Sequence, residues 1–191
     1  MEAEWRELKD ELLDRRLADM PGCVLDCFLL KSGAPCRGEA SHREAVAFAM
    51  ERAPLPDGET EPVWEYDAAR ARARRIDAAR FLALPEARCG ETVRREDGSA
   101  VTPCDAPTDG GVPYWRAFLE PPHGGGGTAA DFRALNEALF PEGTEGLEVY
   151  AWSTDWSDYF DEGREWWGAS CWSVHDPRLD RYVVIFASAT D

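Results

Sequence analysis

The feature that most constrains the fold is a pair of apolar segments near the C-terminal end of the chain. Residues 169–175 and 181–189 have the length and composition of β-strands. The connection between them, residues 176–180, has the length of a hairpin loop. Strands joined in this way pair with each other in opposite directions, so the sequence predicts an antiparallel sheet.

Three further elements are predicted between residues 112 and 154. Residues 112–120 and 147–154 read as strands. Residues 128–140 place apolar side chains at helical spacing, which predicts a helix whose inward face carries Phe132, Leu135 and Leu139.

The first half of the chain reads as mainly helical. Apolar residues at three-to-four spacing predict an amphipathic helix over residues 2–20, which Pro21 and Gly22 end. Residues 23–30 are a short apolar run, which fits a buried strand or a buried helical turn. Residues 41–44 match a capping box, so a helix is expected to begin there.

The region after residue 54 carries three weaker signals. Residues 54–62 read as a loop and residues 63–66 as a short strand. Asp67 is expected to cap an arginine-rich helix that ends before Pro85, and its arginines suit either an anion, a partner or plain solvent exposure. Asp97 and Gly98 predict a two-residue hairpin turn between residues 92–96 and 99–102.

These elements predict one α+β domain over residues 1–191, with a largely antiparallel sheet in the C-terminal half covered by helices. Residues 103–113 are turn-rich and could separate a helical part, 1–103, from a sheet-rich part, 112–191. The connection is too short to define independent domains.

The charge of the chain restricts its partners. The formal net charge is −16, which opposes binding to nucleic acid and to anionic membrane surfaces. A basic protein partner would instead be attracted, although such a charge also serves solubility alone.

The chain reads as a cytoplasmic protein. Its first residues are charged where a secretory signal needs an apolar core, and no apolar run is long enough to span a bilayer. The six cysteines are expected to be reduced thiols in that compartment.

The strongest candidate for a functional segment is residues 152–167, where aromatic rings and carboxylates alternate. Aromatic side chains contribute large contact area, whereas carboxylates resist burial unless they are paired. The segment therefore fits an interface, a catalytic cleft, or a half-buried stretch with rings in the core and acids at the surface. The candidate binding residues are Trp152, Asp155, Trp156, Asp158, Tyr159, Asp161, Glu165 and Trp166.

Part of this segment is similar to known sequences. Residues 153–168, STDWSDYFDEGREWWG, together with the closing ASATD of residues 187–191, resemble a group of small bacterial proteins of unknown function. The resemblance covers about the last quarter of the chain, on the scale of one hairpin and a preceding strand. It implies no activity.

Known catalytic and cofactor motifs are incomplete in this chain. His123 precedes four glycines, as in the oxyanion loop of lipase-like hydrolases, but Trp172 occupies a glycine position that the nucleophile elbow requires. The glycine run lacks the Lys-Ser/Thr pair of a phosphate-binding loop. Cys171, Ser173 and His175 would share one face of a strand, yet Cys171 and His175 would be about 13 Å apart.

Metal motifs are also missing. The cysteine spacings do not match structural zinc knuckles, and the acidic segment does not match an EF-hand. The sequence predicts neither a metal site nor a cofactor.

Three functions remain open. The preferred hypothesis is a non-enzymatic interaction protein that docks a basic protein through an acidic, aromatic surface, as an immunity protein blocking a toxin would. The alternative is a small hydrolase, with carbohydrate as the candidate substrate, that uses two carboxylates drawn from Asp155, Asp158, Asp161 and Glu165. A structural subunit of an oligomer is the third.

Overall fold

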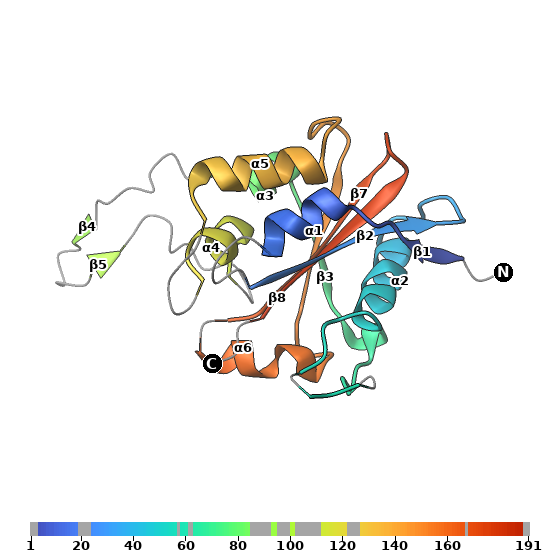
Figure 1. Cartoon of the computed structure of the whole chain (residues 1–191), viewed down its shortest axis with the longest axis horizontal. Coiled ribbons are helices and arrows are strands. Elements are labelled where there is room, and N and C mark those ends of the chain that lie inside the picture. The colour runs from blue at the N-terminus through green and yellow to red at the C-terminus, as the bar shows by residue number, and fades with distance from the viewer. Residues whose placement is uncertain are drawn as a thin grey trace.

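A six-stranded antiparallel sheet forms the centre of the protein in the computed structural model (Figure 1). The structure describes residues 4–18, 24–56, 58–60, 63–84, 93–94, 100–101, 112–121, 127–166 and 168–188. The strand order is β1-β2-β8-β7-β6-β3, and each neighbouring pair runs antiparallel. The strands are β1 (Trp5–Glu7), β2 (Leu25–Ser32), β3 (Ala73–Ile76), β6 (Glu148–Trp152), β7 (Ser170–Asp176) and β8 (Arg181–Ala187).

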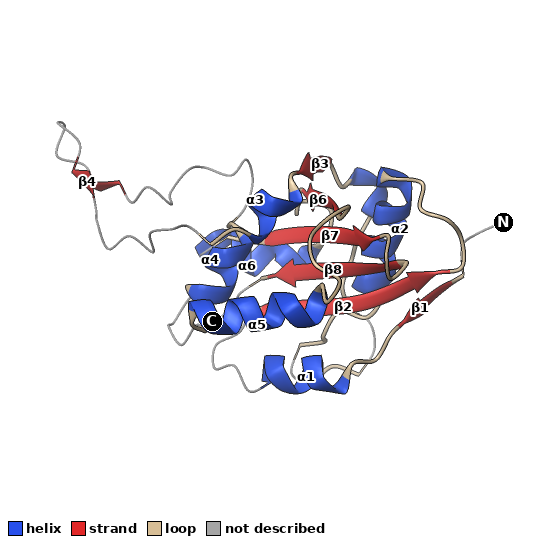
Figure 2. Cartoon of the chain, turned by 90° about the horizontal axis from the view of Figure 1, so that it is seen from above, coloured by secondary structure: helices blue, strands red, loops and turns tan. Residues whose placement is uncertain are grey.

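Helices cover both faces of this sheet (Figure 2). One face carries α1 (Glu11–Ala18), α3 (Ala78–Leu82), α4 (Tyr114–Leu119) and α5 (Ala129–Leu139). The other carries α2 (Glu39–Met50), α6 (Asp161–Trp166) and two short 3₁₀ helices, η1 (Ala68–Arg70) and η2 (Asp158–Phe160). The fold is thus an α+β fold with a single sheet between two helical layers.

Each helical layer encloses its own hydrophobic core. Strand residues alternate between the layers, so that Val183 and Ile185 of β8 face α5 while Val184 and Phe186 face α2. Every residue of β7 is buried, as is every residue of β8 except the half-buried Arg181. A strand pair with both faces buried needs apolar residues at successive positions, which explains the continuous apolar run in β8.

The predicted C-terminal hairpin is confirmed. β7 pairs with β8 over its whole length, from Ser170 opposite Ala187 to Asp176 opposite Arg181. The Asp176 side chain accepts hydrogen bonds from the backbone N–H groups of Arg178 and Leu179, which shapes the turn. The predicted strand over residues 147–154 is β6.

The helix predicted over residues 128–140 is α5, and Thr128 begins it with a complete capping box. The Thr128 hydroxyl accepts from the backbone N–H of Asp131 at 3.2 Å, and the Asp131 carboxylate accepts from the backbone N–H of Thr128 at 2.7 Å. Phe132, Leu135 and Leu139 are buried, as the helical spacing predicts.

The long helix predicted over residues 2–20 is wrong in its first half. Trp5–Glu7 form β1, which pairs with β2, and only Glu11–Ala18 are helical. The Trp5 ring packs on Tyr182 with ring centres 5.1 Å apart. Strand pairing and the packing of the Trp5 ring therefore override the strong helix propensity of this glutamate-, leucine- and arginine-rich sequence.

The arginine-rich helix predicted after Asp67 is also wrong. Asp67 does cap a helix, but this is the three-residue η1, and the chain then extends into β3 before the short α3. β3 pairs with β6 from Ala73 opposite Trp152 to Ile76 opposite Val149. The hydrogen bonds of this ladder override the helix preference of alanine and arginine.

Residues 112–120 form a helix where a strand was predicted. In α4, Tyr114, Ala117 and Phe118 are buried, which is the i, i+3, i+4 spacing of a helical face. A short apolar run fits a strand and a helix equally well when it is read alone.

Four smaller predictions have mixed outcomes. Residues 23–30 are confirmed as a strand from residue 25 onward. The helix predicted to begin at residues 41–44 is present, but the predicted capping box is wrong. α2 begins at Glu39, and the Ser41 hydroxyl accepts from the backbone N–H of Arg37. Residues 63–66 contribute a single bridge, at Tyr66. β4 (Val93–Arg94) pairs with β5 (Ala100–Val101), but the predicted turn at Asp97 and Gly98 lies outside the described residues.

Truncating Phe186 tests the core on the α2 side of the sheet. Its ring lies 5.3–5.4 Å from those of Phe28, Tyr159 and Phe160. Phe186→Ala should lower the free energy of unfolding by about 3–5 kcal/mol in urea denaturation. Leu55→Ala, at an exposed position, serves as the control with a change within about 0.5 kcal/mol. Equal losses in the two variants would contradict the described core.

Candidate functional site

Three aromatic rings of the predicted binding residues lie in the core. Trp152, Trp156 and Tyr159 are only 4%, 2% and 8% exposed. Their rings belong to the apolar cluster between the sheet and α2. The expectation that these rings form an exposed binding surface is therefore wrong, and the interpretation of the rings as core is correct for them.

Local structure explains why the rings turn inward. The hydroxyl of Ser157 caps η2 by accepting from the backbone N–H of Tyr159, and this tight turn directs Tyr159 and Phe160 toward Phe186. The indole N–H of Trp156 donates to the carbonyl of Ser153 at 2.6 Å, so its polar group is satisfied within the segment.

The carboxylates of the segment lie nearer the surface, and two of them pair with arginines. Asp155 is exposed and pairs with Arg72 at 2.9 Å, while the exposed Asp161 pairs with Arg164 in α6. Asp158 is half-buried at the start of η2. Glu165 and Trp166 lie in α6, but their side chains are outside the described part of the structure.

This arrangement gives little support to a pair of catalytic carboxylates. Hydrogen bonds from Ser153 and from the Arg72 guanidinium hold the pKa of Asp155 below its usual value. A general acid in glycoside hydrolysis needs the opposite shift and a second carboxylate across the substrate. Asp155 and Asp161 each face an arginine instead.

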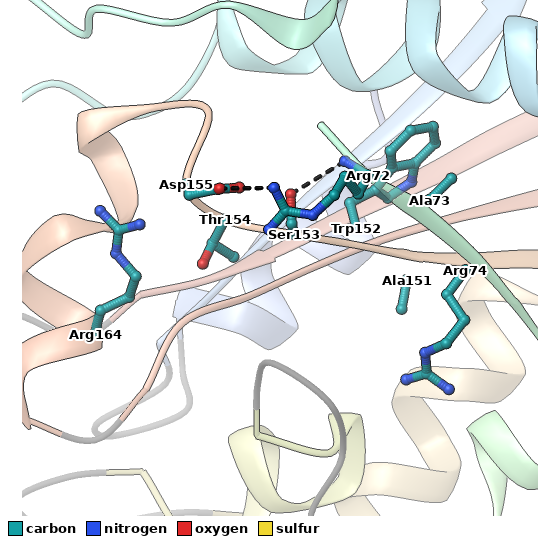
Figure 3. Close-up of a pocket in the computed structure, with 9 residues that line it drawn as sticks. All are labelled: Arg72, Ala73, Arg74, Ala151, Trp152, Ser153, Thr154, Asp155 and Arg164. Carbon is teal, nitrogen blue, oxygen red and sulfur yellow. Dashed lines mark hydrogen bonds and ion pairs between the residues drawn. The ribbon is translucent and has the colours of Figure 1, made fainter. Parts of the chain in front are cut away.

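Arginines also outnumber carboxylates in a hollow beside Asp155 (Figure 3). It has a volume of about 380 Å³ and lies where β3 and β6 meet the loop after β6. Arg72, Arg74 and Arg164 line it, and Asp155 is the one carboxylate among its described lining residues. Arg72 and Arg74, which were predicted to lie in the arginine-rich helix, therefore border this hollow. The hollow is locally basic and does not suit a pair of catalytic carboxylates.

The exposed apolar surface lies elsewhere, in the loop between α2 and η1. Within the described residues, the large hydrophobic side chains that are exposed are Leu55, Val63 and Tyr66, at 37%, 37% and 39%. Three such side chains within twelve positions of one loop form a cluster, which differs from the scattered exposure that folded proteins commonly show.

The predicted segment holds this loop in place. The backbone N–H of Asp67 donates to the carbonyl of Trp156 at 2.8 Å, and that of Asp158 donates to the carbonyl of Glu65 at 3.2 Å. Tyr66 forms a β-bridge with Ser157. The segment 152–160, whose rings are buried, thus holds in place the loop that carries the exposed side chains.

Two aromatic contacts strengthen this attachment. The Trp64 ring meets Tyr159 edge-on, with ring centres 5.3 Å apart, and the Tyr66 ring lies 6.5 Å from that of Trp156. The Trp64 indole N–H donates to the carbonyl of Pro54 at 2.9 Å, which ties the two ends of the loop together. Leu55 therefore stays close to the segment that carries Val63 and Tyr66.

Exposed carboxylates lie near Tyr66, and one of them, Glu51, is paired with Arg52 at 3.2 Å. Glu51, Glu65 and Asp67 are exposed, and the Tyr66 hydroxyl donates to the Glu51 carboxylate at 3.4 Å. Asp158 joins them through its backbone bond to Glu65. We call this surface the acidic–aromatic face; it comprises Leu55, Val63, Tyr66, Glu51, Glu65, Asp67 and Asp158.

Sequence reasoning assigned only Asp158 of this face. It treated residues 54–62 as an ordinary loop and residues 63–66 as a strand, and strand residues are expected to be buried on at least one side. A signal was nevertheless present, because Leu55 and Val63 flank a stretch of proline, glycine and acidic residues that cannot enter a core.

Comparisons with known proteins add no assignment. No family model, no curated protein and no solved structure matches this chain. Among the described residues, no helix combines the length and the apolarity that a membrane crossing requires. A function for this chain therefore has to be inferred from the geometry of the molecule itself.

A buried carboxyl beneath the segment makes stability depend on pH. The Tyr159 hydroxyl donates a hydrogen bond to the Asp26 carboxylate of β2. Burial raises the pKa of Asp26 above its usual 3.8, although the bond from Tyr159 opposes the shift. The folded state therefore holds this proton more tightly than the unfolded chain, and stability falls as pH rises from 3.8 to the raised pKa.

Asp26→Asn should remove this dependence. The amide oxygen can still accept from Tyr159, and no charge has to be buried. Urea unfolding should show equal stabilities for the variant and the native protein near pH 3, with a growing advantage for the variant toward pH 7. Asp14→Asn, at an exposed position of α1, is the matched control and should show no such advantage. A constant difference across the pH range would contradict the prediction.

Proposed function

We propose that this protein is a non-enzymatic interaction protein that docks a basic protein partner on its acidic–aromatic face. The observation that carries the proposal is the clustering of Leu55, Val63 and Tyr66 on one loop. Exposed apolar patches bordered by polar residues are typical of protein interaction sites.

The chemistry of this face favours one kind of partner. Tyr66 presents a large, stiff ring of the type that often dominates binding energy at the centre of an interface. Its neighbours Glu51, Glu65 and Asp67 are positioned as an acidic rim, which speeds and selects encounters with a basic surface. The whole chain, at −16, adds a long-range field of the same sign.

The same charges disfavour a second copy of this chain as the occupant. Two acidic–aromatic faces would bring like charges together, and like charges across an interface cost several kcal/mol. The proposal therefore commits to a heterologous, basic protein.

An inhibitor of a toxin would fit this description. Enzymes that cleave nucleic acid carry basic surfaces because they bind the phosphate backbone. An acidic protein with an aromatic anchor can cover such a surface, which is how an immunity protein would block a toxin. We place the protein in the cytoplasm, where free thiols such as Cys36 and Cys171 persist.

A double variant of the face tests the proposal. Tyr66→Ala removes the anchor, and Glu65→Lys reverses a charge of the rim; both positions are exposed, so the fold should be retained. The native protein and the variant would be immobilised and exposed to lysate of the source organism at low and moderate salt. Retained proteins would be identified and quantified by mass spectrometry, and the affinity of any candidate would be measured with purified components.

Glu145→Lys is the matched control. It makes the same charge change at an exposed position before β6, whereas the acidic–aromatic face contacts the chain after β6, at the other end of that strand. We expect one basic protein that binds the native protein and the control alike, with affinity reduced at least about 100-fold in the double variant. Equal binding to all three forms, or no basic protein retained by the native form, would overturn the proposal.

A further inference from the structure

Three potential metal ligands meet between α2 and the sheet. Cys36 lies in the turn before α2, His42 in the first turns of α2, and Glu148 at the start of β6. The sulfur, an imidazole nitrogen and a carboxylate oxygen lie within 4.8 Å of one another. Proximity alone does not make a metal site, so each of the three ligand groups also has to point toward the ion.

The imidazole of His42 is held in one orientation. It is 0% exposed, and its Nδ1 lies 2.8 Å from the hydroxyl oxygen of Ser173 in β7. The indole N–H of Trp152 donates to the same oxygen at 2.8 Å. The rings of Tyr150 and Tyr182 lie 4.7 and 5.3 Å from the imidazole and meet it edge-on. The ring is therefore fixed, with Nε2 directed at Glu148.

The two atoms that face each other lack hydrogen bonds. His42 Nε2 and Glu148 Oε1 are both buried and have no hydrogen-bond partner among the described residues, yet they are 3.4 Å apart. If Nδ1 carries the proton and donates to Ser173, Nε2 presents a lone pair to a carboxylate oxygen. In this tautomer two acceptor atoms would face each other, and a bound cation would make that contact favourable.

The spacing fits a tetrahedral metal ion. Two ligand atoms that each lie about 2.0–2.1 Å from a tetrahedral zinc ion are about 3.3 Å apart. The observed separation of 3.4 Å between Nε2 and Oε1 therefore needs almost no adjustment.

The remaining groups also suit a cation. Cys36 is half-buried in a non-helical turn, so its sulfur can move the short distance that coordination requires. Gly38 has a φ of +63°, and a side chain there would begin 3.7 Å from Glu148 Oε1. The positive φ favours glycine at this position, and 3.7 Å is an ordinary contact distance. A thiolate and a carboxylate together would neutralise a divalent ion.

We propose that Cys36, His42 and Glu148 bind one Zn²⁺ ion, with a fourth coordination position open to water. A mixture of sulfur, imidazole and carboxylate ligands suits zinc, whereas calcium and magnesium prefer oxygen alone. Ser173 acts as the positioning residue that sets the tautomer of His42. The ion joins the turn before α2 to β6, so it stabilises the attachment of α2 to the sheet.

Metal titration of the full chain tests this site. The protein would be stripped with a chelator under reducing conditions and titrated with Zn²⁺ alone, and bound metal would be counted by native mass spectrometry. Replacement by Co²⁺ should produce the visible absorption of a tetrahedral ion with a thiolate-to-metal charge-transfer band. One equivalent should bind and raise the midpoint of thermal unfolding.

Two variants and one control decide whether these residues are the ligands. Cys36→Ser and Glu148→Gln should each reduce zinc affinity by at least about tenfold and remove its effect on the thermal midpoint. Cys27→Ala deletes another thiol and should bind zinc as the native protein does. His42 is not substituted, because its removal from the core can unfold the protein. Zinc binding that is unchanged in both ligand variants would overturn the proposal.

The tautomer of His42 provides a second measurement. Long-range ¹H–¹⁵N NMR of the metal-free protein distinguishes a proton on Nδ1 from one on Nε2. We expect the proton on Nδ1. A proton on Nε2 in a protein that binds no zinc would show that His42 simply donates to Glu148, and the metal site would be rejected.

Discussion

The antiparallel pairing of β7 with β8 is the interaction on which the rest of the structure depends. Both strands are buried on both faces, so neither face of the sheet can remain without a helical cover. Helices from each half of the chain provide it, with α2 on one face and α5 on the other. The β2 strand, from the first part of the chain, pairs directly with β8, and the two parts therefore share one sheet.

The end of this sheet also carries the surface that we propose as a docking site. Residues 152–160 use their rings to close the core on the α2 side, and the same residues attach the loop that carries Tyr66. The buried rings of residues 152–160 and the exposed ring of Tyr66 thus lie next to each other. A segment that resembles a binding surface in sequence instead supports the proposed one, because large rings contribute more to stability when buried than when exposed.

The sequence predicted elements well where local and tertiary preferences agree. The β7–β8 hairpin and the capped helix α5 have strong local signals, and burial acts in the same direction. Residues 73–76 and 114–119 were misread because alanine and arginine favour a helix that strand pairing overrides, and because a short apolar run has no unique period. The cluster of Cys36, His42 and Glu148 could not be predicted, since Glu148 lies in a distant segment of the chain and the three residues have no characteristic spacing.

The two outer strands of the sheet have a consequence for how this protein can recognise others. β1 has three residues and β3 has four, and both carry charged side chains: Arg6 and Glu7 in one, Arg74 and Arg75 in the other. Short, charged outer strands prevent the unpaired backbone groups from acting as a template for another chain. These strands therefore disfavour edge-to-edge aggregation, and they equally disfavour a partner that would add a strand to the sheet.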